Sequence, residues 1–198
     1  KENIARDLAL AKDAGFTDIV VDVRPTTGDV LFKTNLVDQV KFMYAWIGSN
    51  YTKVERTATW DYLQAFVDEA RKQGLRIHAA INTFVGGNQI DGGTGLLYRD
   101  QSKAEWATQM NMQVGITSVM NTSESTKFFN PAHPEVQTFL CDLLKDLAGY
   151  DLDGIFLDRG RFLNLQADFS EESRKQFEEY MGGIRIQNYP NDILAPGA

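Results

Sequence analysis

Residues 150–162 of the chain read Y-D-L-D-G-I-F-L-D-R-G-R-F, and this stretch decides the expected fold. A turn-prone acidic lead-in is followed by a short apolar run at 155–157, and the sequence then changes abruptly to charge at Asp158. A short apolar run between turn signals is typical of a buried strand. Because charges are costly in a core, we expect Asp158, Arg159 and Arg161 at the C-terminal rim of a parallel sheet, where α/β folds place their chemistry.

Two earlier segments have a similar layout. The run D-I-V-V-D-V-R at residues 18–24 is rich in β-branched residues and ends before Pro25, which cannot continue a central strand. The run R-I-H-A-A-I-N at residues 76–82 follows the same plan. Side chains alternate between the two faces of a strand, so each segment has one apolar face and one that becomes polar. The polar faces carry Asp22, Arg24, His78 and Asn82.

Amphipathic patterns predict a helix before each of these strands and another after the last. They are expected at residues 3–14, 59–74, 134–147 and 170–181, with Thr59 as the cap of the second. The connections at residues 26–58 and 85–129 show no clear period and are expected to be long, irregular and functional.

The alternation of helices and strands favours an α/β fold with right-handed crossovers. Long loops follow the strands, as they do in a (β/α)8 TIM barrel. No glycine-rich turn joins a strand to a helix, which argues against a dinucleotide-binding fold. We therefore expect residues 1–198 to form a single partial TIM-barrel catalytic domain with only some of the barrel strands.

Composition narrows the possible partners. The net charge is −7 and no cluster of Lys and Arg offsets it, which argues against nucleic acid. No apolar run is long enough to span a membrane. The chain has one cysteine, Cys141, and two distant histidines, His78 and His133, so we expect no internal disulfide, metal or cofactor. It begins without an initiator Met or a signal sequence, and an upstream portion is expected. The oligomeric state stays open.

The polar strand ends suggest sugar chemistry. A carboxylate beside Arg, Asn and His suits the stabilisation of positive charge that develops on a sugar ring. Glycoside hydrolysis needs two carboxyl groups, about 5–5.5 Å apart for retention or roughly 6.5–9.5 Å for inversion. Asp158 is the candidate catalytic residue and Asp22 the second choice. The alternatives are a rim salt bridge for Asp158, a self-contained Asp22–Arg24 pair and a satisfied interior histidine at position 78.

Tryptophans in the long connections are candidates for stacking on sugars, because their rings are amphipathic. Trp46 and Trp106 are predicted to stack, whereas Trp60, at a helix start, is expected to pack. The predicted substrate-binding residues are therefore Asp22, Arg24, Trp46, His78, Asn82, Trp106, Arg159 and Arg161.

Four pieces together resemble the glycosyl-hydrolase-like family 10 proteins, which are bacterial, often exported, α-amylase-like TIM barrels. The pieces are L-A-K-D-A-G-F-T-D-I-V-V-D-V-R-P, D-E-A-R-K-Q-G-L-R-I-H-A-A-I-N, F-N-P-A-H-P-E-V and Y-D-L-D-G-I-F-L-D-R. The resemblance covers about residues 3 to 162. It implies that residues 18–24, 76–82 and 154–158 are the second, third and fourth barrel strands. The first strand would then lie upstream of the chain and strands five to eight beyond residue 198.

The last piece is also similar to the α-amylase pattern D-G-x-R-x-D, whose final Asp is the nucleophile. This implies the nucleophile role for Asp158, although Phe156 stands where amylases have Arg. The amylase general acid is a Glu on the fifth strand, outside this sequence. The resemblance implies an extracellular or periplasmic retaining glycosidase that degrades a polysaccharide or oligosaccharide. The alternative is a catalytically silent carbohydrate-binding barrel.

Overall fold

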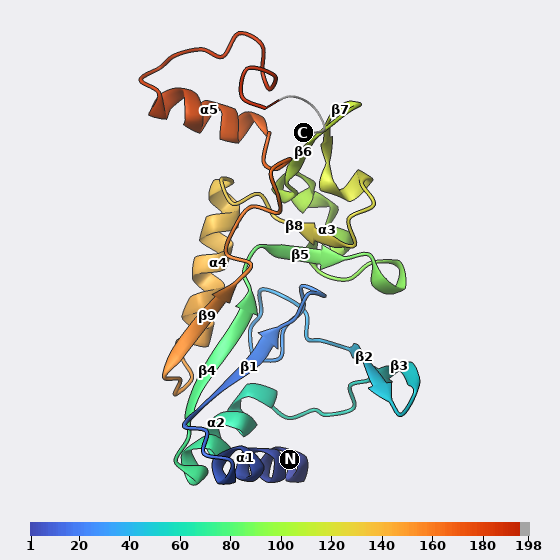
Figure 1. Ribbon diagram of the computed structural model, residues 1–198, viewed down its shortest axis with the longest axis vertical. Coiled ribbons are helices and arrows are strands. Elements are labelled where there is room, and N and C mark those ends of the chain that lie inside the picture. Colours follow the sequence, from blue (N-terminus) through green and yellow to red (C-terminus); the bar gives the residue numbers. More distant parts are fainter. Residues whose placement is uncertain (195–198) are drawn as a thin grey trace. The chain divides into compact units, whose positions relative to one another are not determined.

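The computed structural model describes residues 1–194 and contains a three-stranded parallel sheet. Its strands are β1 (Asp18–Arg24), β4 (Arg76–Asn82) and β9 (Gly154–Asp158), in the order β1–β4–β9 (Figure 1). β1 and β4 pair in parallel, with Asp18 opposite Arg76. The backbone N–H of Asp153 donates to the carbonyl of Ile77 at 2.8 Å, so β9 begins beside the start of β4. All three predicted strands are confirmed, bounds included.

The chain divides into two compact units. Unit 1 consists of Lys1–Pro25, Asp29–Ile81 and Leu143–Asp158. Unit 2 consists of Thr26–Gly28, Asn82–Asp142 and the residues from Arg159 on. Unit 1 therefore contains nearly all of the parallel sheet. The single-domain assignment of residues 1–198 and the partial barrel stay predictions, whereas the α/β class with a parallel sheet is confirmed.

The four expected helices are present. They are α1 (Glu2–Asp13), α2 (Tyr62–Gln73), α4 (Pro134–Leu147) and α5 (Glu171–Tyr180). The predicted cap of α2 was wrong: Asp61, not Thr59, is the N-cap, and its carboxylate accepts the N–H of Gln64. Two residues of suitable type stand close together there, and the helix begins after the second. Within residues 1–194 the longest and most apolar helices still fall short of what a bilayer crossing needs.

The two faces of the sheet differ as the alternation predicted. Val21 and Val23 of β1 are buried, as are Ile77, Ala79 and Ile81 of β4. Unit 1 also buries one side of α2 and the last turn of α4, through Leu63, Val67, Ala70, Leu143 and Leu147.

The opposite face is exposed in part. Val20 is 52% exposed and Phe156 is 57% exposed. Asp22 and Asp158 follow these residues at an interval of two, so they lie on the same face and are exposed. The other two polar strand ends expected there, Arg24 and Asn82, are buried.

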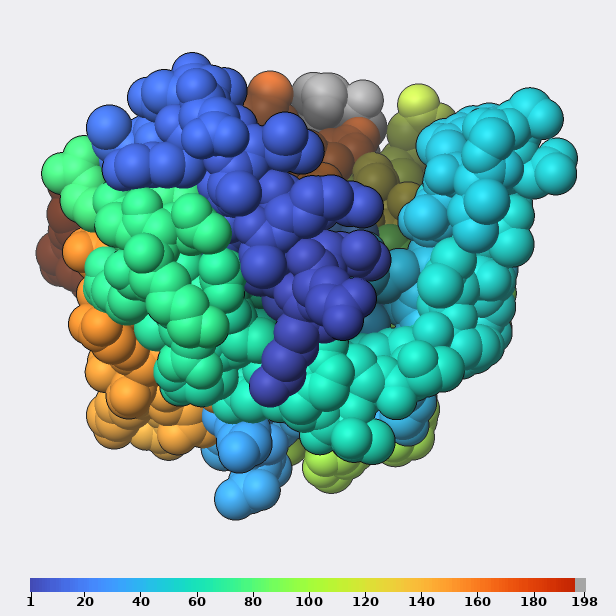
Figure 2. Space-filling view, turned by 90° about the horizontal axis from the view of Figure 1, so that it is seen from below, coloured from blue at the N-terminus to red at the C-terminus, as the bar shows by residue number. Residues whose placement is uncertain are grey.

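The two long connections contain secondary structure, and the prediction of irregular loops was wrong. The first holds a hairpin of β2 (Phe42–Ile47) and β3 (Asn50–Glu55), which stands out from the surface in cyan in Figure 2. The second holds two antiparallel pairs, β5 (Val85–Asn88) with β8 (Thr126–Phe128) and β6 (Gln109–Met112) with β7 (Gly115–Ser118). It also holds the short helices η1 (Ile90–Gly92), α3 (Leu96–Arg99), η2 (Gln101–Trp106) and η3 (Val119–Asn121).

Candidate active site at the ends of the parallel strands

Asp158 is the last residue of β9, an edge strand of the three-stranded sheet, and its side chain is exposed. The chain leaves the strand through Arg159, whose φ is +49°. Residues other than glycine rarely adopt this left-handed conformation. It costs about 1–3 kcal/mol and is concentrated at functional sites. The turn thus ends β9 directly after the carboxylate and leaves that carboxylate at the rim.

Asp22 lies on the same face as Asp158 but too far away for the retaining geometry. Asp22 is level with Ala80 of β4, whereas Gly154 lies against His78 and Asp158 follows four positions later. Asp158 therefore lies two residues further along the strand direction than Asp22, and two strands away from it. Spacings of about 4.8 Å between strands and about 3.3 Å per residue place the two Cα atoms roughly 12 Å apart. Two short Asp side chains do not bridge that separation to the roughly 5–5.5 Å between carboxyl groups that retention needs.

Arg24, at the end of β1, is a fully buried cation. Burial lowers the pKa of its guanidinium to about 10, and the carboxylates of Asp29 and Asp22 oppose this shift. The register of β1 shifts between Asp22 and Arg24, and the Arg24 backbone N–H donates to Asp22 Oδ1 at 3.2 Å. Arg24 thus remains charged at neutral pH beside two acids. Sequence reasoning did not single out Asp29, although the T-T-G-D turn that contains it was a signal.

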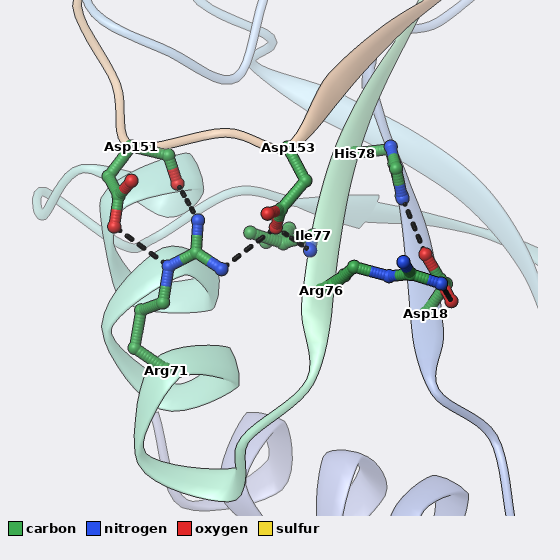
Figure 3. A network of polar contacts seen from close by, with 7 residues as sticks. All are labelled: Asp18, Arg71, Arg76, Ile77, His78, Asp151 and Asp153. Atoms are coloured by element: carbon green, nitrogen blue, oxygen red, sulfur yellow. Dashed lines mark hydrogen bonds and ion pairs between the residues drawn. The ribbon is translucent and has the colours of Figure 1, made fainter.

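His78 lies near the other end of the sheet. Its Nε2 is 2.9 Å from Asp18 Oδ1, and Arg76 Nη2 donates to Asp18 Oδ2 at 2.7 Å (Figure 3). Hydrogen bonds from Arg76, Thr17 and His78 hold the pKa of the Asp18 carboxyl well below its usual range. His78 is level with Gly154, four residues before Asp158, or about 13 Å along the strand. This placement favours the interpretation of a satisfied interior histidine.

A second ion-pair network stabilises the start of β9. Arg71 of α2 donates from Nε to Asp151 Oδ2 at 2.7 Å and from Nη1 to Asp153 Oδ2 at 2.8 Å (Figure 3). Asp153 also accepts the backbone N–H of Ile77 at 2.8 Å. The Ile77 N–H and Arg71 both lower the pKa of the Asp153 carboxyl. Asp151 and Asp153, which precede β9 in the chain, therefore connect its start to β4 and α2.

The tryptophans separate into an exposed and a buried group. Trp46 on β2 is 70% exposed, and its ring lies 5.3 Å from that of Tyr51 across the hairpin. Trp106 is only 6% exposed, its Nε1 donates to Glu135 at 3.1 Å, and its ring packs on Phe129 and Phe139. Trp46 can therefore reach a ligand directly, whereas Trp106 serves packing in this structure.

The remaining predicted residues differ in setting. Asn82 is the last residue of β4 and is buried. Arg161 is exposed and donates from Nη1 to the carbonyls of Phe162 and Leu163, at 2.9 and 2.6 Å. Arg159 follows β9 directly. The roles of all three in binding stay predictions.

The fold places the chain among the α/β proteins to which known glycosidases belong. It is similar to alpha-L-fucosidase isoenzyme 2 from Paenibacillus thiaminolyticus, with a TM-score of 0.59 and 18% identity over 91% of this chain and 23% of that one. A hypothetical protein from Ruminiclostridium thermocellum shares the fold with a TM-score of 0.55 and 15% identity, over 91% of this chain and 83% of that one. At these identities the likeness concerns fold alone.

The chain belongs to the family described as Glycosyl hydrolase-like 10, which matches residues 1–191. The family resemblance drawn from the four sequence pieces is thereby confirmed. The chain is also 31% identical, over 201 residues, to an S-layer-related protein of Niallia circulans, which covers 98% of this chain. It spans only 12% of that relative's length. Membership of this glycosyl-hydrolase-like family indicates a carbohydrate-related role.

Proposed function

We propose that this chain is part of a retaining glycoside hydrolase that acts on a polysaccharide or oligosaccharide, with Asp158 as the nucleophile. The observation that carries the proposal is the exposed Asp158 carboxylate at the C-terminal end of a parallel strand, in a member of a glycosyl-hydrolase-like family. The strained residue that follows, Arg159, supports a functional role for this rim.

In the proposed reaction, Asp158 attacks the anomeric carbon while a second carboxylic acid protonates the departing glycosidic oxygen. The bond between the anomeric carbon and that oxygen breaks, and a glycosyl ester forms on Asp158. Water then hydrolyses the ester, with the second residue accepting the proton of the water.

The second carboxyl group must lie about 5–5.5 Å from Asp158, which Asp22 does not satisfy. We place it on a strand that pairs with the outer edge of β9, in sequence beyond residue 198. On this proposal Asp22 and the buried Arg24 shape the rim at the end of β1. Trp46, whose ring is exposed, supplies a stacking contact with the sugar, and Asn82, Arg159 and Arg161 contribute polar contacts.

The test is Asp158→Asn in the protein, with reducing-sugar release from a panel of polysaccharides as the assay. Activity is expected to fall at least about 10³-fold, as it does when other hydrolases lose a nucleophile. The melting temperature is expected to stay unchanged, because the side chain is exposed. Asp22→Asn is the matched control on the same face, with an expected loss below about tenfold. Full activity of Asp158→Asn would overturn the assignment.

Azide rescue separates a nucleophile from an acid. In Asp158→Gly, azide is expected to enter the vacated space, attack the anomeric carbon and displace the leaving group. The product is a glycosyl azide of inverted configuration. A glycosyl azide of retained configuration contradicts the nucleophile role, because azide has then attacked a glycosyl-enzyme ester formed on another residue.

A second candidate function is carbohydrate binding without catalysis. The observation in its favour is Phe156, 57% exposed, where the amylase pattern has Arg. This alternative predicts saturable glycan binding with no turnover. Turnover by the purified full-length protein would exclude it.

We also propose a cell-surface location, because the relative that matches 98% of this chain is an S-layer-related protein. Protease treatment of intact bacteria is expected to remove the protein from an immunoblot while a cytoplasmic marker survives. Survival of both would contradict this location.

A further inference from the structure

Unit 1 contains an open pocket of about 800 Å³ that the predicted site residues do not line. Its wall comes from the segment after β1, the segment between β3 and α2, and the end of α4. The residues that matter for its chemistry are Lys33, Asn35, Arg56, Trp60, Asp61 and Asp146.

Among residues 1–194, the two bases of this pocket, Lys33 and Arg56, form no ion pair with a carboxylate. Arg56 donates from Nη1 to Gln39 Oε1 and from Nη2 to the carbonyl of Trp60, each at 3.2 Å. Its Nε is buried, and no acceptor for it lies among residues 1–194. A buried donor left without an acceptor costs about 1–3 kcal/mol, so a native structure that keeps one needs an explanation.

The anionic part is satisfied only by neutral donors. Asp61 accepts the hydroxyl of Tyr150 at 2.7 Å and the N–H of Gln64 at 3.1 Å. Asp146 accepts the hydroxyl of Thr34 at 2.6 Å. Among the described residues these two acids form no ion pair with the two bases of the same pocket.

Opposite charges that share a pocket without pairing offer donors and acceptors to a ligand at once. A hydroxyl group both donates and accepts, so a ligand with several hydroxyls can bond to the acids and the bases together. A free anion or cation would satisfy only one of the two sets. The pocket therefore favours a neutral, hydroxyl-rich ligand.

Trp60 adds the apolar surface that a sugar ring requires. Its ring is held nearly parallel to that of Tyr62, at 9° and 6.1 Å between centroids. Trp60 is half-buried, and the Lys1 Nζ of the same chain lies 5.7 Å from the centroid of its ring. The exposed part of the ring can stack on a sugar.

The pocket is close to the end of β1. Phe32 lines the pocket, and the N–H of the preceding Leu31 donates to the carbonyl of Val23 in β1 at 2.8 Å.

We propose that this pocket is a glycan subsite, remote from Asp158, that binds one glycosyl unit of the substrate. Trp60 stacks on the sugar ring, while Arg56 and Asn35 donate to its hydroxyls and Asp146 accepts from them. The inference deepens the proposed function and rests on it for the choice of a glycan as ligand. It implies a substrate several units long.

The experiment measures binding without turnover, in an Asp158→Asn background. Cellotetraose, xylotetraose, maltotetraose and the β-1,4-linked N-acetylglucosamine tetramer are titrated separately into ¹⁵N-labelled protein. The chain has three tryptophans, so the indole N–H signals give an internal control. At least one sugar is expected to shift the Trp60 signal and to leave the buried Trp106 signal in place.

Arg56→Gln is expected to weaken the binding of that sugar about tenfold or more, since hydrogen bonds to charged groups are worth about 1.5–3 kcal/mol. Arg6→Gln is the matched control, because Arg6 is an exposed residue of α1 paired only with its neighbour Asp7. Asn35→Ala leaves every charge of the pocket in place, so it serves as a second variant if Arg56→Gln lowers the melting temperature.

Two results would overturn the proposal. One is that none of the four sugars moves the Trp60 signal at millimolar concentration. The other is binding that Arg56→Gln and Asn35→Ala change no more than Arg6→Gln does. Hydrolysis by the unsubstituted protein is measured separately. The subsite proposal can therefore be refuted while the catalytic proposal stands, and the catalytic proposal can be refuted while the subsite proposal stands.

Discussion

The two ends of the parallel sheet carry similar residues in different settings. Near the strand starts, Asp18 pairs with Arg76 and His78, and Arg71 pairs with Asp151 and Asp153. Charges there neutralise one another. At the other end of β9, Asp158 is exposed at the rim.

This difference shows that a carboxylate on a strand is not by itself evidence of a catalytic role. Asp153 and Asp158 stand five positions apart in one stretch. Asp153 accepts two hydrogen bonds that join β9 to β4 and α2, whereas Asp158 is exposed at the strand end. The first end holds the sheet together, and the second presents a carboxylate to solvent. The division matches that of (β/α) barrels, in which stability and catalysis occupy opposite ends.

The strongest test of this division compares Asp153→Ala with Asp158→Ala. Asp153→Ala removes the acceptor for both Ile77 N–H and Arg71, so a clear fall in melting temperature is expected. Asp158→Ala is expected to leave the melting temperature unchanged while activity falls at least about 10³-fold. Circular dichroism melting curves and a hydrolysis assay measure the two effects. Equal melting temperatures for the two variants would remove the distinction.

Acid is expected to lower the stability that the carboxylates near the strand starts contribute to the folded protein. Asp18 and Asp153 have folded pKa values below the ordinary value, so the unfolded chain binds protons at higher pH than the folded one. Their contribution is therefore complete above the unfolded pKa of about 3.9 and is lost as pH falls below it. Urea unfolding midpoints at pH 7, 4 and 3 measure the decline.

The double variant Asp18→Asn, Asp153→Asn is the control for this pH effect. Its midpoint is expected to be lower at pH 7 and to decline less steeply with acid. A decline as steep as that of the unsubstituted protein assigns the acid sensitivity to other carboxyl groups.

The smallest expected effect is that of His78→Gln on catalysis. Because His78 lies about 13 Å from Asp158 along the sheet, kcat/KM is expected to change less than about threefold. The stability gain from Asp18 is expected to fall, because its contact with His78 is lost. A tenfold loss of kcat/KM with KM unchanged would contradict a purely structural role for His78.

The sheet could be predicted from sequence because its signals are local. Each strand is an apolar run with charge or a turn at both ends, and side-chain alternation assigned Val20 and Asp22 to one face correctly. The pairing of His78 with Asp18 could not be predicted in this way. It depends on the register between β1 and β4, which places the two residues together across strands.

The β2–β3 hairpin was missed for a different reason. β2 reads F-M-Y-A-W-I and is apolar on both faces, so alternation gave no signal there. The Gly48-Ser49 pair between the two strands is nevertheless a hairpin pattern. Trp106 was misjudged as exposed because its loop contains a short helix that turns the ring onto Phe129 and Phe139. Burial of a loop residue is a tertiary property.

The spacing of the sheet strands along the chain also affects how the protein folds. Asp18 and Arg76 are 58 residues apart, and Ile77 and Asp153 are 76 apart. Each pairing must first close a long loop, an entropic cost that slows folding. The hairpins in the long connections need only local closure and can form in microseconds. We therefore expect local hairpins to form early, with β9 and its rim carboxylate placed among the last elements.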